Sequence, residues 1–139
     1  MRQAIRHLNV RARSRGLSDF TGEVAAFVRD ASIDTGILTI FCRHTSASLL
    51  IQENADPSVQ RDLERHFALL APEDPERYEH DAEGRDDMPA HLRTALTQVQ
   101  LSIPVGQGRM MLGSWQGIYL FEHRARPQER DIVLHLIGE

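Results

Sequence analysis

A chain of 139 residues has the length of one domain and can bury about two-thirds of the surface that its unfolded form exposes. Its formal charge of -4 argues against nucleic-acid binding, because such domains carry a net basic face, and no apolar run is long enough to span a membrane. Cys42 is the only cysteine, which excludes an internal disulfide. With no charged-then-apolar leader before the fold, we expect a cytoplasmic protein.

The basic residues are all arginine, sixteen in number, and lysine is absent. Schiff-base chemistry, a lysine general base and a P-loop lysine are therefore excluded. The arginine side chains can bind carboxylate or phosphate groups through two parallel hydrogen bonds from the planar guanidinium. A genome rich in arginine codons is the simpler explanation of this bias, but the chemical exclusion holds in either case.

Strand and helix signals alternate in the first third of the chain. Residues 1–12 alternate loosely between polar and apolar side chains, which predicts a strand. A helix with apolar residues at helical spacing follows, with Thr21 as its N-cap. Residues 37–42 form an apolar, β-rich run that predicts a central strand, and residues 48–52 predict a second one.

The middle of the chain predicts two helices joined by a long polar segment. Asp56, followed by a proline, marks the start of a helix that should end before Pro72. The next helix should start at Pro89 and carry His91 in its first turn. The polar segment between these prolines has about eighteen residues, which is long for a connection in a compact domain and favours a functional role.

The last third of the chain predicts antiparallel strands. Residues 101–105 and 109–112 flank Gly106-Gln107-Gly108, which indicates a hairpin, and residues 117–122 and 131–137 predict another pair of strands. We therefore expect a single α+β domain. Its largely antiparallel sheet or sandwich should pack against two to three helices.

Candidate chemistry concentrates between His44 and His91, a stretch that holds four of the seven histidines and several closely spaced carboxylates. Imidazole and carboxylate groups at this density can bind a divalent metal or transfer protons. The spacing of His80 and His91 matches no compact zinc motif, however, so both could instead be solvated loop residues. His44, directly after a predicted strand, could likewise be a hydrogen-bonded residue at a sheet edge.

Other polar residues near these histidines could take part in the same chemistry. Ser46 lies two residues after His44 and should share its side of a strand, but no nucleophile elbow surrounds it. Glu83, Asp86 and Asp87 could complete a metal shell, orient a histidine or act as acid and base, or they could be the solvated face of a loop.

A glycine-flanked segment near residue 115 suggests a second contact region. Trp115 and Gln116 lie between Gly113 and Gly117, and glycine within a strand marks a bulge or a close approach of ligand or backbone. Trp115 could stack on a ring while Gln116 bonds a polar edge. Trp115 could equally fill the core at a bulge.

Seven segments together resemble the YjbQ family, small proteins also named secondary thiamine-phosphate synthases, over nearly the whole chain and in the same order. The segments are His44-Thr45-Ser46-Ala47-Ser48, Asn54-Ala55-Asp56-Pro57, Tyr78-Glu79-His80-Asp81, Glu83-Gly84-Arg85-Asp86-Asp87-Met88-Pro89-Ala90-His91-Leu92, Gly108-Arg109, Gly113-Ser114-Trp115-Gln116-Gly117-Ile118 and Ile137-Gly138-Glu139.

The resemblance implies an α+β homotrimer with a polar site near the subunit boundaries and a small, phosphorylated substrate. It implies that a divalent metal, zinc or magnesium, is held by His44, His80 and His91. The candidate catalytic residues are Ser46, Asp56, Glu83, Asp87 and Gln116, which lie within or beside these family segments.

The implied reaction joins an aminopyrimidine pyrophosphate to a thiazole phosphate and releases pyrophosphate. Two residues depart from the family pattern: Ser114 replaces a usual threonine, and Arg85 replaces a small or amide residue and adds charge beside the site. A metabolite-binding or damage-control module without catalysis and a trimeric structural protein remain alternatives.

Overall fold

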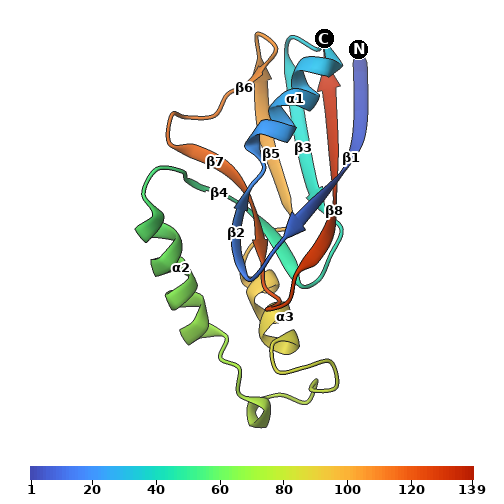
Figure 1. The fold of residues 1–139 in the computed structure, drawn as a ribbon. Coiled ribbons are helices and arrows are strands. Elements are labelled where there is room, and N and C mark those ends of the chain that lie inside the picture. The colour runs from blue at the N-terminus through green and yellow to red at the C-terminus, as the bar shows by residue number, and fades with distance from the viewer.

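The computed structural model describes all residues from 1 to 139 and consists of two antiparallel sheets with three α-helices (Figure 1). The larger sheet has the order β1 (Arg2–Ala12), β8 (Gln128–Gly138), β3 (Gly36–Cys42), β5 (Gln100–Gly106) and β6 (Arg109–Met110). The smaller has the order β2 (Gly16–Asp19), β7 (Gln116–Glu122) and β4 (Ala47–Glu53). The expected α+β class and antiparallel pairing are confirmed.

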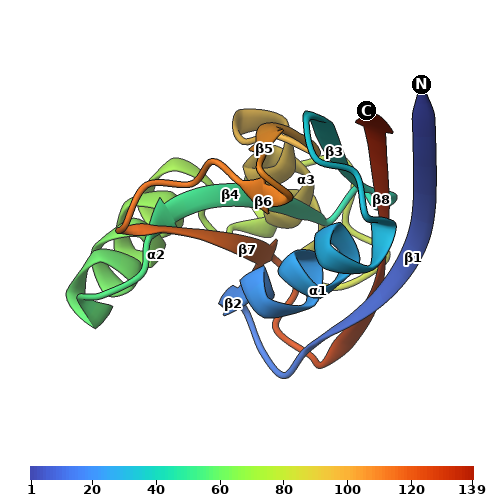
Figure 2. The same ribbon diagram turned by 90° about the horizontal axis from the view of Figure 1, so that it is seen from above.

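The core lies between the two sheets and α1 (Thr21–Ala31), which covers one end of the space between them (Figure 2). Alternate residues of the strands point into it, as the two-residue period of a strand requires. Leu38 and Ile40 of β3 are fully buried, while Ile37 and Phe41 on the opposite face are 45% and 42% exposed. One face of the larger sheet therefore builds the core and the other stays open.

The remaining helices lie at one end of the molecule. α2 (Pro57–Leu70) begins where Asp56 Oδ1 accepts a hydrogen bond from Ser58 N at 2.9 Å, as the sequence predicts. It extends away from the sheets and has no buried residue (Figure 1). A short 3-10 helix, η1 (Pro75–Arg77), leads to α3 (Asp87–Leu96). None of these helices combines the length and the hydropathy needed to cross a bilayer.

Several local predictions are wrong, each for a physical reason. Thr21 does not cap α1; it is the first helical residue, and its hydroxyl accepts from Ile118 N at 2.8 Å. The two C-terminal strands do not pair with each other, because β7 and β8 belong to different sheets. β2 is absent from the prediction because its four residues carry no clear alternation. Trp115 is no core filler, since it is 66% exposed.

Candidate metal centre

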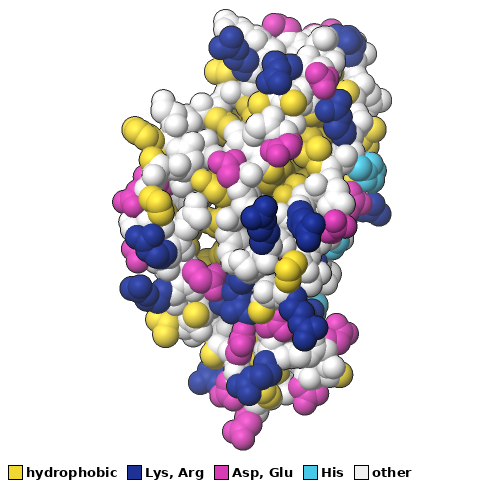
Figure 3. Space-filling view, viewed as in Figure 1, with side chains coloured by type: hydrophobic (Ala, Val, Ile, Leu, Met, Phe, Trp, Pro, Cys, Tyr) yellow, Lys and Arg dark blue, Asp and Glu magenta, His cyan; other side chains and the backbone are white.

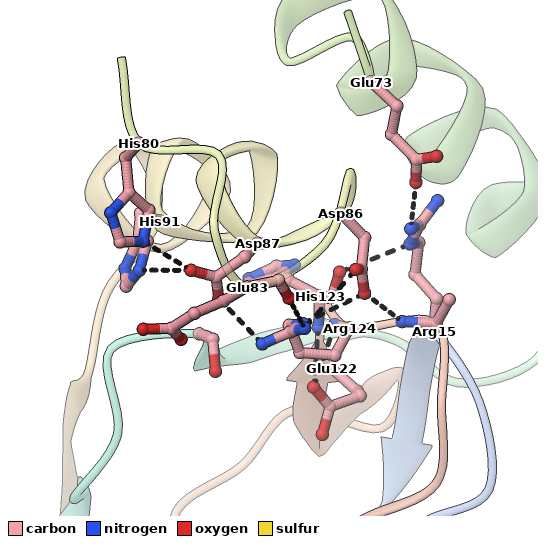
Figure 4. A network of polar contacts seen from close by, with 12 residues as sticks. Arg15, Glu73, His80, Glu83, Asp86, Asp87, His91, Glu122, His123 and Arg124 are labelled. Carbon is pink, nitrogen blue, oxygen red and sulfur yellow. Dashed lines mark hydrogen bonds and ion pairs between the residues drawn. The ribbon is translucent and has the colours of Figure 1, made fainter. Parts of the chain in front are cut away.

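Three predicted site residues meet at the start of α3. The helix begins at Asp87, two residues before the predicted start, so Asp87 and His91 lie one turn apart on the same face. His80 approaches from the preceding loop (Figure 4). Its Nε2 lies 2.7 Å from Asp87 Oδ2, and His91 Nε2 lies 3.3 Å from the same oxygen. All three ligand atoms fall within 4.8 Å of one another.

The orientation of His91 is fixed by its second ring nitrogen. His91 Nδ1 lies 3.0 Å from the carbonyl oxygen of Thr45, which can only accept a hydrogen bond, so Nδ1 carries the hydrogen. The unprotonated electron pair of a neutral ring is then on Nε2, which faces Asp87. A backbone carbonyl in this position is the usual second contact of a metal-binding histidine.

Arg124 holds the other side of the aspartate. Its Nη1 donates to Asp87 Oδ1 at 2.7 Å, and its Nε donates to Asp86 Oδ2 at 3.0 Å (Figure 4). Burial alone would raise the pKa of Asp86, but hydrogen bonds from Arg124 and from Ala125 N outweigh it, so this pKa lies below its ordinary value. Arg124 thus leaves only Oδ2 of Asp87 facing the two imidazoles.

The donor set fits a divalent ion of the zinc type. Two imidazole nitrogens and one carboxylate oxygen form the protein ligand set of several catalytic zinc sites, which keep a fourth position open. Zinc–nitrogen bonds of about 2.0–2.1 Å in a tetrahedron place neighbouring ligand atoms roughly 3.3 Å apart. The pair formed by His91 and Asp87 already has this spacing, at 3.3 Å.

Pockets adjoin the centre on both sides. A groove of about 570 Å³ next to His91 has a mainly apolar lining of Phe41, Cys42, Ala95 and Val99. A smaller pocket of about 120 Å³ lies next to His80, and its charged lining residues are Arg85 and Asp81. The centre therefore has room for an apolar group on one side and a compact polar group on the other.

His44, the third predicted metal ligand, lies outside this group of ligand atoms. Its Nε2 accepts a hydrogen bond from Asp131 N at 2.8 Å, and burial lowers the pKa of the ring. The imidazole does line the groove beside His91. The structure thus brings His44 to the wall of the adjoining groove, where it can contact a substrate but coordinates an ion through Nε2 only if this hydrogen bond breaks.

Ser46 is held by a buried ion pair. Its Oγ accepts from Arg130 Nη2 at 3.1 Å, and the same guanidinium binds both carboxylate oxygens of Glu122. Glu122 is fully buried and Arg130 is 5% exposed. Nothing in this arrangement activates the hydroxyl as a nucleophile.

The other predicted catalytic residues serve different contacts. Asp56 caps α2, and Gln116 Oε1 accepts from Gly113 N at 2.8 Å. These two belong to a junction at which Asn54 N donates to Trp115 O at 3.0 Å. Glu83 contributes its backbone carbonyl, which accepts from Arg124. Of the five residues only Asp87 belongs to the histidine cluster.

Two polar features were missed from the sequence. Arg124 lies 37 residues beyond Asp87, and no spacing rule connects them. His123 is 1% exposed and its Nε2 lies 2.8 Å from the fully buried Ser48 Oγ. Burial and the positive charge of Arg93 lower the pKa of His123 to about 3. The helical i, i+4 spacing of Asp87 and His91 is a further sequence signal for this site, but it applies only when the helix starts at Asp87.

Comparison with known proteins identifies the family. The family described as "UPF0047 protein YjbQ-like" matches residues 6–139. The chain belongs to the YjbQ family. Its relative UPF0047 protein sll1880 from Synechocystis is 50% identical over 132 residues, covering 95% of this chain and 90% of that protein. UPF0047 protein YjbQ from Escherichia coli O157:H7 is 43% identical, covering 95% and 96% of the two chains. The resemblance found in the sequence is confirmed.

Solved structures of YjbQ-like proteins share the fold. The conserved hypothetical protein TT1486 from Thermus thermophilus superposes with a TM-score of 0.84 at 35% identity, covering 95% of this chain and 99% of that one. A protein of the YjbQ/UPF0047 family from Clostridium acetobutylicum gives 0.83 at 30% identity, covering 96% and 99%. These names specify a family and a fold but no reaction.

Proposed function

We propose that this protein is a metal-assisted enzyme that acts on a small phosphorylated molecule at His80, Asp87 and His91. The observation that supports this proposal most strongly is the geometry of His91. The Nδ1–H group of His91 donates to the Thr45 carbonyl oxygen. In a neutral ring, the lone pair of Nε2 then points toward Asp87 Oδ2, which is only 3.3 Å away. Two electron-rich atoms repel at this distance unless a proton or a metal ion lies between them, and two imidazoles around one carboxylate oxygen suit a metal ion.

Zinc suits this site better than magnesium, because imidazole nitrogens are poor ligands for magnesium and good ones for zinc. A bound zinc ion would act as a Lewis acid toward a carbonyl or phosphoryl oxygen. The side chains of the protein have separate tasks. Arg124 holds Asp87 in place through a hydrogen bond to Oδ1, and Thr45 fixes the tautomer of His91.

The surroundings of the centre favour a substrate with an apolar ring and an anionic group. Phe41 and Val99 offer an apolar wall beside His91. On the other side, Arg85 donates one hydrogen bond to the Glu73 carbonyl and has no carboxylate partner, so its guanidinium is free to bind an anion. Arg85 departs from the family pattern, and we propose that it strengthens the preference for a phosphorylated substrate.

We propose thiamine-phosphate synthesis as the first reaction to test, as a secondary activity. The reaction forms a bond between a pyrimidine methylene carbon and a thiazole nitrogen and breaks the bond from that carbon to pyrophosphate. It requires a site that stabilises the leaving anion and protects a cationic intermediate from water. Arginine and an apolar groove are the corresponding features here.

The test combines metal analysis with turnover. Native protein should contain close to one transition-metal ion per chain, and His80→Ala and His91→Ala should lose both the metal and any activity. His66→Ala is the matched control, because that imidazole is exposed on α2 and lies outside the cluster. Full metal retention in both cluster variants would refute the proposed centre. Saturable binding of a ring phosphate with no product under any metal would indicate a binding module instead.

We also propose that the chain assembles as a homotrimer. The open face of the larger sheet presents Ile5, Ile37 and Phe41, which are 67%, 45% and 42% exposed, and Leu69 on α2 is 78% exposed. Apolar side chains grouped on one sheet face are typical of an interface between subunits. Sedimentation should give three times the mass of the chain, and Phe41→Arg should shift it toward the monomer. A native monomer at micromolar concentration would contradict this proposal.

A further inference from the structure

A second pocket lies between α1 and the hairpin of β5 and β6. These elements are at the end of the molecule opposite α3 (Figure 1). Its volume of about 440 Å³ is within the range of small-molecule sites. The lining consists of Ala25, Val28, Arg29, Gln107, Gly108, Arg109, Met110 and Leu112. None of these residues belongs to the histidine centre.

The walls of this pocket are apolar and held in place. Val28 is buried, and Met110 and Leu112 pack against the core. The hairpin turns at Gln107 and Gly108, whose φ angles of 53° and 70° are those of the tight turn that matches strand twist. Gly108 N also donates to Asp34 O at 2.9 Å, which ties the turn to the segment after α1. The pocket is therefore formed without a ligand.

Two arginines give the pocket its charge. Arg29 comes from the last turn of α1 and Arg109 from the start of β6, and no acidic residue lines the pocket. Neither guanidinium has a carboxylate partner, whereas Arg43, in the groove beside His91, is paired with Asp131 at 2.7 Å. Figure 3 shows basic side chains beside exposed apolar ones at this end of the molecule, with some acidic side chains among them. In a chain of net charge -4, this is a local basic site.

We propose that this pocket binds a small organophosphate, with the phosphoryl group between Arg29 and Arg109 and an apolar or aromatic body against Val28, Met110 and Leu112. A phosphate dianion accepts paired hydrogen bonds from planar guanidinium groups and relieves the repulsion between two like charges. The apolar walls exclude water from the other half of the ligand. This site does not depend on the proposed metal chemistry.

Calorimetric titration with 1-naphthyl phosphate, in the presence of EDTA, tests the proposal. We expect one saturable site per chain, with inorganic phosphate and 1-naphthol each binding more weakly than the joined molecule. Arg29→Gln and Arg109→Gln should each weaken binding about tenfold or more, because each removes charge-assisted hydrogen bonds. Arg61→Gln is the matched control: Arg61 is an exposed arginine on α2 without an ion pair, and its variant should bind like the native chain.

Further variants distinguish binding in this pocket from binding at the metal centre and from contact with a neighbouring copy. Ala25→Leu narrows the pocket within a helix and should weaken naphthyl phosphate more than inorganic phosphate. His91→Ala should bind normally, and a loss there would assign the ligand to the metal centre and overturn the proposal. Absence of saturation at about millimolar ligand, or equal weakening by Arg61→Gln, would also overturn it. One further result would overturn the proposal. If the native chain binds no ligand and the Arg29→Gln, Arg109→Gln double variant changes its assembly state, a neighbouring copy of the chain fills the pocket.

Discussion

Acid should destabilise this fold, and a buried histidine, His123, should contribute a large part of the effect. His123 is 1% exposed, its Nε2 bonds to Ser48 Oγ at 2.8 Å, and its ring packs against Phe121 with centroids 4.4 Å apart. Burial and the nearby guanidinium of Arg93 lower the pKa of His123 to about 3. The native state therefore keeps the ring neutral at any pH at which the protein is ordinarily studied.

The size of the effect follows from proton linkage. The unfolded chain protonates this residue near its ordinary pKa of about 6.5, whereas the folded chain does so only near 3. The contribution of the neutral His123 to the free energy of unfolding is thus fully present above about pH 6.5. It falls as the pH drops from about 6.5 toward about 3, by up to about 1.4 kcal/mol per pH unit. Between about pH 6.5 and about pH 4.5 the loss should reach roughly 2–3 kcal/mol.

Urea unfolding of the native chain and of His123→Gln between about pH 7.5 and about pH 4.5 measures this effect. Glutamine places an amide near the position of Nε2 and does not titrate. Over this pH range, the free energy of unfolding of the variant should therefore fall by about 2–3 kcal/mol less than that of the native chain. EDTA in every sample removes metal linkage, and His66→Gln, with an exposed ring on α2, should follow the native curve. Parallel curves for native protein and His123→Gln would refute the reasoning.

Three further substitutions test other features by their effect on urea midpoints. Asp56→Ala removes the N-cap of α2 and should cost about 0.5–2 kcal/mol; no change would show that the exposed helix is held by other contacts. Gly138→Ala would place its Cβ 2.0 Å from a backbone carbonyl oxygen and should destabilise strongly, whereas Gly22→Ala, which meets nothing within 4 Å, should not. Glu122→Gln should cost about 3–5 kcal/mol, because it leaves Arg130 buried without its charge partner, and a neutral result would contradict that pairing.

Local signals predicted most of the fold. The apolar, β-rich run of β3 and the Asp56 cap followed by a proline predicted elements that agree with the structure within one or two residues. Local signals did not predict which strands pair with each other. β7 and β8 are consecutive in sequence, yet each pairs with strands far away in the chain, because the chain crosses between sheets at residues 123–127. That crossing depends on packing of the whole core, which no short window of sequence contains.

The sequence predicted only part of the candidate site, because some of its contacts form only in the tertiary structure. His80, Asp87 and His91 were chosen for their density and family positions, and the structure brings these three together. Starting the third helix at Asp87 rather than at Pro89 would have revealed the i, i+4 pair directly. Arg124 could not be found, since it meets Asp87 only through tertiary structure. His44 lies beside a neighbouring groove, and its local sequence contained nothing that distinguishes a groove wall from a metal ligand.

His123 and His91 differ in what their ring nitrogens contact. His123 is enclosed, with its Nε2 bonded to a neutral hydroxyl, and its ring is stable without charge. At the proposed metal centre, Asp87 Oδ2 faces two imidazole nitrogens, and a proton on His80 Nε2 satisfies only the contact at 2.7 Å. His91 Nε2 at 3.3 Å then still faces an anion. A divalent ion satisfies both nitrogens at once and releases the proton, so its affinity should fall as the pH drops.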